Sequence, residues 1–329
     1  MRIGCVSLTG LRRKSTMYDK RRHHLSYSLL KSYSLLKQML SFATDNEYSA
    51  TDAHVARDAL LQVAGECLTE DALVDDARRY DFLEQRFGRD KCRRLGFFPM
   101  PPGYLVSVVI PVFNEAKTIE QVIQRVRDVG LPCEMVVVDD GSSDGTRDVL
   151  DGLRDEEDLT IVFHEHNQGK GAAIRTGFTH VRGDVVAIQD ADMEYDPRDF
   201  WYLIEPIVGD TADVVYGSRF CNNDQSDSPL WHQTGNQMIT WLSNLFTGLK
   251  FTDVETCYKV FRRDLVDRLA PGLRECRFGI EIEMTAKLAK MKGVRFYERP
   301  ISYAKRTYAE GKKIGWRDGV RALWCMVRY

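Results

Sequence analysis

The chain has 329 residues, of which 43% are hydrophobic and 29% are charged, and its formal net charge is −2. These values are typical of a globular protein with one large domain or two modest ones, and they give no reason to expect a nucleic-acid partner. The eight cysteines form no C-x-x-C pair, which argues against a disulfide framework and favours a reducing, cytosolic compartment. No run approaches the roughly 18–20 apolar residues that a membrane-spanning helix needs.

The first 100 residues carry no group of side chains with an evident chemical role. Residues 1–25 are basic, which favours a disordered tail over a phosphate-binding or membrane-surface patch. Apolar residues recur at helical spacing through 51–95, and the prolines and glycine of 99–103 predict a stiff linker. We therefore predict a basic tail and helical extension of unknown role over 1–100, followed by the main domain over 104–329.

Strands and helices alternate from Tyr104 onwards. Apolar runs predict strands at 106–110, 135–138, 159–163, 185–188 and 213–216. Helical spacing predicts helices at 118–128, 146–153, 170–180, 199–207, 236–249 and 278–290, and edge strands are expected at 294–297 and 300–303. This alternation predicts an α/β fold, with a mainly parallel sheet and helices on both faces. Ligands of such sheets bind outside the carboxyl ends of the strands.

Polar residues follow each of the first five predicted strands. The runs are Pro111-Val-Phe-Asn114-Glu115, Asp139-Asp140-Gly-Ser-Ser-Asp-Gly, Asn167-Gln-Gly-Lys170-Gly, Asp190-Ala-Asp192 and Gly217-Ser-Arg219. One such run is ordinary in a turn, but five along one edge predict a binding site. Carboxylates such as Asp139 or Asp140 can accept hydrogen bonds from a base or ribose, and Lys170 at a helix start can meet phosphate.

Asp190 and Asp192 follow a buried strand directly. Alternation along an extended backbone points both carboxylates to one side, where they repel each other unless a cation lies between them. Oxygen ligands favour Mg²⁺ or Mn²⁺, and Glu194 continues the alternation as a further ligand. A solvated acidic strand end is the alternative interpretation.

The order and spacing of these runs resemble glycosyltransferase family 2, from about Val106 to the C-terminus. The most similar branch is that of the polyprenyl-phosphate (dolichol-phosphate) mannosyl- and glucosyltransferases. The absence of G-x-x-x-x-G-K-[ST], and of G-x-G-x-x-G after the first strand, argues against a P-loop protein and a Rossmann dehydrogenase. The resemblance implies the GT-A fold of nucleotide-diphosphosugar transferases.

The resemblance also implies roles for individual residues. Asp192 and Glu194 would hold the metal, Asp190 would face the ribose or sugar of the donor, and Arg219 would lie near the acceptor phosphate. The nucleotide-sugar is expected to contact Pro111, Asn114, Glu115, Asp139, Asp140, Lys170 and Asp190.

The segment that begins at Asp253 resembles the segment beside the reacting centre in this branch. An aspartate there acts as general base in relatives that use hydroxyl acceptors, whereas an ionised phosphate needs only positioning and charge neutralisation. We therefore expect Asp253 to orient the site, with base catalysis as the alternative. Lys259 is interpreted as a strand-surface lysine without a firm role, and Glu281 and Glu283 as first-turn carboxylates that the helix dipole favours.

Two amphipathic segments in the second half bear on the acceptor. The apolar residues of 236–249 fall within one arc, which either faces the core or lies at a membrane interface, as the corresponding segment of the resembling branch does. The helix expected at the C-terminus combines apolar residues with flanking arginines, which suits either a docked helix or anionic headgroups. The acceptor phosphate is expected at Arg219, Arg306, Lys312 and Lys313.

We therefore predict a metal-dependent, inverting glycosyltransferase that moves a sugar from a UDP- or GDP-sugar to an acceptor, with polyprenyl phosphate favoured. Catalysis would depend on Asp190, Asp192, Arg219 and Asp253, with Mg²⁺ or Mn²⁺ acting on the leaving diphosphate. The protein is expected at the cytoplasmic face of the membrane as a peripheral protein. Three alternatives stay open: a family 2 transferase for a soluble hydroxyl acceptor with Asp253 as base, a sugar nucleotidyltransferase, and a non-catalytic nucleotide-sugar-binding module.

Overall fold

The computed structural model describes residues 54–58, 61, 76–221, 230–304, 321, 324–325 and 328–329. Within this part of the chain, residues up to Pro99 belong to one compact unit and residues from Met100 onward to another. The first unit contains the helices α3 (Asp76–Phe87) and α4 (Arg89–Arg94). Leu83 and Leu95 are fully buried there, and the Tyr80 ring stacks on Phe97 with 6.0 Å between the ring centroids.

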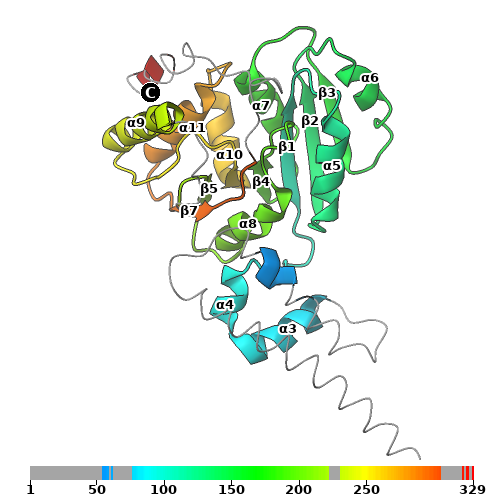
Figure 1. Ribbon diagram of the computed structural model, residues 1–329, viewed down its shortest axis with the longest axis vertical. Coiled ribbons are helices and arrows are strands. Elements are labelled where there is room, and N and C mark those ends of the chain that lie inside the picture. Colours follow the sequence, from blue (N-terminus) through cyan, green and yellow to red (C-terminus); the bar gives the residue numbers. More distant parts are fainter. Residues whose placement is uncertain are drawn as a thin grey trace, which may run out of the picture. The chain divides into compact units, whose positions relative to one another are not determined.

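A seven-stranded sheet forms the centre of the second unit, with the strand order β3-β2-β1-β4-β6-β5-β7 (Figure 1). Its strands are β1 (Val106–Val112), β2 (Cys133–Asp139), β3 (Leu159–Phe163), β4 (Val185–Ile188), β5 (Val214–Ser218), β6 (Lys259–Arg262) and β7 (Phe296–Pro300). The pairs β1·β2, β1·β4, β2·β3 and β5·β7 are parallel, whereas β6 runs antiparallel to β4 and β5. The predicted α/β fold with a mainly parallel sheet is confirmed.

Helices connect the strands and cover them. They are α5 (Ile119–Asp128), α6 (Thr146–Asp151), α7 (Lys170–Phe178), α8 (Phe200–Val208), α9 (Leu230–Thr247), α10 (Arg263–Leu269) and α11 (Ile280–Ala289). In Figure 1, β1 and β2 lie between α5 and α7. Every residue of β1 and β4 is buried, as expected for central parallel strands covered on both faces. Among the described residues, no helix is long and apolar enough to cross a membrane.

The close contact between α7 and β1 depends on Gly177. A Cβ atom at this position would lie 2.4 Å from Cγ1 of Val109, so any larger residue would push the helix off the sheet. Because α7 begins at Lys170, this packing also fixes the helix start that faces the carboxyl ends of the strands.

Three sequence predictions about secondary structure need correction. The two expected edge strands at 294–297 and 300–303 are one strand, β7, and Tyr303 forms only an isolated bridge with Tyr195. Lys259 was assigned to a strand, but the bounds of that strand, β6, were not given, and the helix α10 was not predicted. Finally, β4 ends at Ile188 and the chain then turns, so Asp190, Asp192 and Glu194 do not continue an extended strand.

Candidate active site

Asp190 is held by side chains from two other parts of the chain. Lys170 Nζ, at the start of α7, lies 2.8 Å from Asp190 Oδ1, and the thiol of Cys257 donates to the same oxygen at 3.0 Å. Lys170 Nζ also lies 3.3 Å from Oε1 of Glu281 on α11. Burial alone would lower the pKa of Lys170, but the carboxylates of Asp190 and Glu281 raise it overall. Lys170 is therefore a fixed cation between two carboxylates.

Asp192 and Glu194 lie in the turn after β4. Met193 between them has a φ of 64°, a conformation that non-glycine residues rarely adopt, and the Glu194 amide donates to Asp192 Oδ1 at 3.2 Å. The Tyr303 hydroxyl donates to Glu194 Oε2 at 2.8 Å. Burial, followed by the charges of Asp190 and Glu194, raises the pKa of Asp192 to about 7. The described residues contain no group of three or more His, Cys, Asp or Glu side chains placed to hold a metal ion.

Asp139 and Asp140, at the end of β2, are both buried. Asp139 Oδ2 accepts a hydrogen bond from Arg147 Nε at 2.8 Å. Asp140 accepts from the amides of Gln168 at 2.9 Å and Gly169 at 2.7 Å, and its Oδ1 lies 2.8 Å from Nδ1 of His164. These carboxylates tie the end of β2 to the loop that leads into α7. A nucleotide that contacts either one would share oxygens that protein donors already occupy.

The loops after β1 and β2 are joined by hydrogen bonds. The Asn114 amide donates to Ser142 Oγ at 2.8 Å, and Asn114 Oδ1 accepts from the Ser143 amide at 2.9 Å. The Glu115 amide donates to Thr146 Oγ1 at 2.9 Å. Pro111 lies within β1 and is buried. The structure thus brings the expected nucleotide-side residues together at one edge of the sheet.

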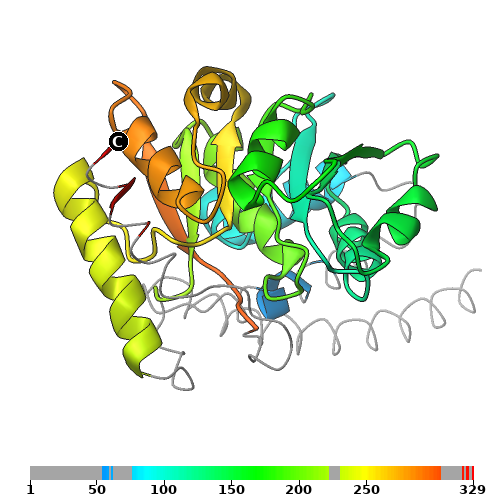
Figure 2. The same ribbon diagram turned by 90° about the horizontal axis from the view of Figure 1, so that it is seen from above.

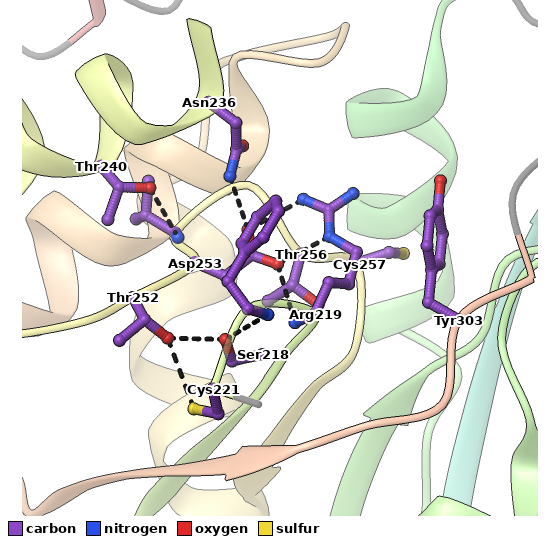
Figure 3. A network of polar contacts seen from close by, with 12 residues as sticks. Ser218, Arg219, Cys221, Asn236, Thr240, Thr252, Asp253, Thr256, Cys257 and Tyr303 are labelled. Atoms are coloured by element: carbon purple, nitrogen blue, oxygen red, sulfur yellow. Dashed lines mark hydrogen bonds and ion pairs between the residues drawn. The ribbon is translucent and has the colours of Figure 1, made fainter. Parts of the chain in front are cut away.

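Arg219 and Asp253 form a buried ion pair, shown in Figure 3. Arg219 Nε and Nη2 donate to the two Asp253 oxygens at 2.6 and 2.8 Å, and Asn236 Nδ2 on α9 donates to Oδ1 at 3.2 Å. Burial opposes the ionisation of Asp253, but Arg219 outweighs it and lowers the pKa of this carboxyl. The Arg219 guanidinium also lies 5.3 Å from the ring centre of Tyr303, the residue that bonds Glu194.

The buried side chain of Lys259 holds the loop after Asp253 in place. Its ammonium group donates to the carbonyl of Val254 at 3.0 Å and to the carbonyl of Thr256, and it lies 4.6 Å from the ring centre of Tyr216. Lys259 is fully buried, and burial lowers its pKa. The prediction of a strand-surface lysine is wrong, because β6 is an internal strand between β4 and β5.

The helix α9 lies beside α11 at the edge of this unit (Figure 2). Its inner face carries Asn236, which reaches Asp253, and Thr240, whose Oγ1 accepts from the Val254 amide at 3.3 Å. The outer face carries large apolar side chains, which are exposed by 51–66%: Met238, Trp241, Leu245 and Phe246. The predicted apolar arc is therefore divided, since Ile239 is buried whereas Met238, Leu245 and Phe246 are exposed.

Some of the residues expected to bind the acceptor phosphate lie outside the part of the chain that the structure describes. Arg306, Lys312 and Lys313 lie outside the described residues, as does most of the expected C-terminal helix. Arg321, one of the arginines expected to flank that helix, forms an ion pair with the buried Glu275 at 2.9 Å. The charge of this arginine is therefore paired with a carboxylate of the same chain.

Comparison with known proteins places the chain in a family. Residues 107–270 match the family described as "Glycosyl transferase family 2". The chain is 32% identical over 219 residues to the undecaprenyl-phosphate mannosyltransferase of Micrococcus luteus, covering 64% of this chain and 88% of that protein. The chain belongs to glycosyltransferase family 2. The protein is accordingly a glycosyltransferase, and neither a nucleotidyltransferase nor a non-catalytic module needs to be invoked.

Other relatives agree with this assignment. Glycosyltransferase AglJ of Haloferax volcanii is 31% identical over 208 residues, covering 63% of this chain and 65% of that protein. Among solved structures, glucosyl-3-phosphoglycerate synthase from Mycobacterium tuberculosis, in complex with Mn²⁺, UDP and phosphoglyceric acid, matches with a TM-score of 0.54 at 20% identity, covering 69% of this chain and 78% of that one. This likeness confirms the GT-A fold.

The candidate site also contains side chains to which the sequence analysis gave no role in the site. Cys257 contacts Asp190, Tyr303 lies between Glu194 and Arg219, and Glu281 shares Lys170 with Asp190. Glu283 is not simply a first-turn carboxylate, because it accepts from the amides of residues 274 and 275. A search for polar residues that follow strands does not find these side chains, since they come from a loop, an isolated β-bridge and a helix.

Proposed function

We propose that this family 2 glycosyltransferase transfers a sugar from a UDP- or GDP-sugar to a polyprenyl phosphate at a membrane surface, with inversion at the anomeric carbon. The observation that carries the proposal is the orientation of α9. One face of this helix bonds the Arg219–Asp253 pair through Asn236, and the other exposes four large apolar side chains.

The outer face of α9 suits a lipid surface. A helix that faces water usually directs polar residues outward, whereas α9 directs Met238, Trp241, Leu245 and Phe246 outward. Tryptophan and other apolar residues on one helix face favour the boundary between headgroups and acyl chains. An acceptor with a lipid tail and a phosphate head would place the tail along α9 and the head at the Arg219 end. The name of the Micrococcus luteus relative supports the same acceptor class.

The state of Asp253 favours a phosphate over a hydroxyl acceptor. A hydroxyl acceptor needs a base to remove its proton, but Asp253 is fully buried, bonded to Arg219 and has a lowered pKa. A phosphate is already ionised near neutral pH and can attack by itself. One of its oxygens forms the new bond to the anomeric carbon. The bond between that carbon and the leaving nucleoside diphosphate breaks, and the diphosphate oxygen takes its electron pair. Asp253 would hold Arg219 in place for this step.

Asp192 and Glu194 fit a divalent cation. They supply oxygen donors. Burial, followed by the charges of Asp190 and Glu194, raises the pKa of Asp192, and a cation would relieve the repulsion among these carboxylates. Because the described residues offer no complete metal site, the donor diphosphate would supply further ligands. When bound, Mg²⁺ or Mn²⁺ stabilises the charge that develops on the leaving diphosphate.

A donor and acceptor panel tests the proposal. Purified full-length protein is mixed with UDP- and GDP-sugars, Mg²⁺ or Mn²⁺, and either polyprenyl phosphate or the matched polyprenol without the phosphate. We expect one donor to release nucleotide and label the polyprenyl phosphate, with no transfer to polyprenol. Transfer to a soluble hydroxyl acceptor but not to polyprenyl phosphate would refute the proposal and make Asp253 the base.

A further inference from the structure

Glu255 stands out in the loop between Asp253 and Tyr258. The other five residues of this loop are at most 2% exposed, and Glu255 is the only one whose side chain is partly open. No hydrogen bond or ion pair joins its carboxyl group to any residue that the structure describes. A half-buried carboxyl group without a partner inside a candidate active site is a group for which a substrate can supply the partner.

The backbone around Glu255 is held firmly even though its side chain is not. Lys259 binds the carbonyl groups of Val254 and Thr256, the two neighbours of Glu255. The Val254 amide donates to Thr240 at 3.3 Å, and the Cys257 amide donates to the Tyr195 hydroxyl at 3.3 Å. The loop therefore presents this one side chain in a fixed position, as preorganised catalytic groups require.

Glu255 lies between the acceptor side and the donor side of the site. Two residues before it, Asp253 binds Arg219, and two residues after it, Cys257 binds Asp190. Its charged neighbours are Arg219, Asp253, Glu281 and Lys259. Burial is the main cause that raises the pKa of Glu255 to about 7, with Asp253 and Glu281 adding to it and Arg219 and Lys259 opposing it.

We propose that Glu255 is a further catalytic residue, which holds a proton and donates a hydrogen bond from its carboxyl group to the acceptor phosphate during transfer. This inference rests on the proposed phosphate acceptor. An ionised carboxylate at this position would repel the phosphate, whereas a carboxylic acid bonds an anionic oxygen strongly. The proton stays on Glu255 throughout, because the phosphate oxygen that forms the new bond is already ionised and the electron pair of the broken bond leaves with the diphosphate.

The predicted pH dependence has a definite sign. Glu255 carries its proton below about pH 7 and loses it above. Transfer to phosphate should therefore fall about tenfold per pH unit on the alkaline side, once the carboxyl group is mostly ionised. A general base at this position would produce the opposite sign, with activity rising as the carboxyl group ionises.

The test compares Glu255→Gln and Glu255→Ala with the wild type between pH 6 and pH 9, using farnesyl phosphate as a short acceptor and the donor identified by the panel. The amide of Glu255→Gln still donates but does not titrate, so the ratio of its rate to the wild-type rate should rise about tenfold per unit above pH 7. The transfer rate of Glu255→Ala should be about 10- to 100-fold lower than that of the wild type at pH 6, because alanine has no side-chain hydrogen-bond donor. Thermal unfolding at both pH limits verifies that each variant is folded.

Glu298→Gln is the matched control. The Glu298 carboxylate accepts hydrogen bonds from the amides of Thr252 and Asp253, where the loop begins. The pKa of Glu298 is also raised, mainly by burial. This variant should keep the alkaline fall. A folded but inactive Glu255→Gln, a rate ratio that is constant with pH, or an alkaline fall that disappears with Glu298→Gln would each overturn the inference. If the wild type transfers nothing to any phosphate acceptor, the proposed function itself fails, and this inference fails with it.

Discussion

Removing one charge of the Arg219–Asp253 pair should destabilise the protein strongly. Asp253 is fully buried and Arg219 is 16% exposed, so Asp253→Asn leaves a guanidinium that is poorly hydrated and has lost its counter-charge. Breaking a buried ion pair by removing one partner costs about 3–5 kcal/mol. Because Arg219 keeps some contact with solvent, we expect the lower end, about 3 kcal/mol. For a domain of this size that corresponds to a fall in Tm of about 6–12 °C.

The assay is thermal unfolding at pH 7 of four proteins: wild type, Asp253→Asn, Arg219→Met, and the double variant Arg219→Met with Asp253→Leu. Replacing both charges with apolar side chains removes the unpaired charge, so the double variant should be more stable than either single variant. A double variant whose loss equals the sum of the single losses would refute the reasoning.

The pH dependence of this effect gives a second check. The pKa of Asp253 is lower in the folded protein than in the unfolded chain, so its contribution is complete above the unfolded value of about 4 and is lost as the pH falls through the folded value. The difference in urea stability between wild type and Asp253→Asn should therefore be constant from pH 5 to 7 and shrink in more acidic solution.

Three further predictions concern the metal, the buried lysine and the exposed helix face. Asp192→Ala should abolish divalent-dependent nucleotide release, and full activity would contradict the metal assignment. The Tm of this variant should equal or exceed that of the wild type, because the substitution removes a buried carboxyl group that its neighbours repel. Lys259→Met should lower kcat at least about tenfold with little change in KM for the donor, because the loop carbonyls lose their donor; an unchanged kcat in steady-state assays would contradict this. Trp241→Ser with Leu245→Ser should change stability by less than about 1 kcal/mol, because both side chains are exposed. It should reduce co-sedimentation with anionic lipid vesicles and spare transfer to farnesyl phosphate, and unchanged sedimentation would remove the membrane argument.

The strands β1 to β5 could be predicted from the sequence, because each of them is an apolar run bounded by polar turns. The strand Val185–Ile188 was located correctly, and Lys170 was placed at a helix start. The burial of β6 was not predicted, since its four residues include two basic ones that suggest a surface. Only the sheet order shows that Lys259 is enclosed between neighbouring strands.

The site could be predicted in outline but not in its internal pairing. Strand ends indicate which residues gather at an edge, but they do not show which side chains bind each other. The partners of Asp190 are Lys170 and Cys257, which lie 20 and 67 positions away in the sequence. The partner of Arg219 is Asp253, a pairing that the sequence does not indicate. Long-range pairs of this kind follow from tertiary packing, for which a single sequence carries no local signal.

The antiparallel strand β6 has a consequence for how the protein folds during synthesis. The strands β1 to β4 can pair with one another as they leave the ribosome, but β5 adjoins only β6 and β7. Until residues 259–262 emerge, β4 therefore presents an unpaired edge, and the two halves of the sheet have no strand in common. A nascent chain that stalls before this point would bind chaperones or aggregate, because the edge of the apolar strand β4 would still be unpaired.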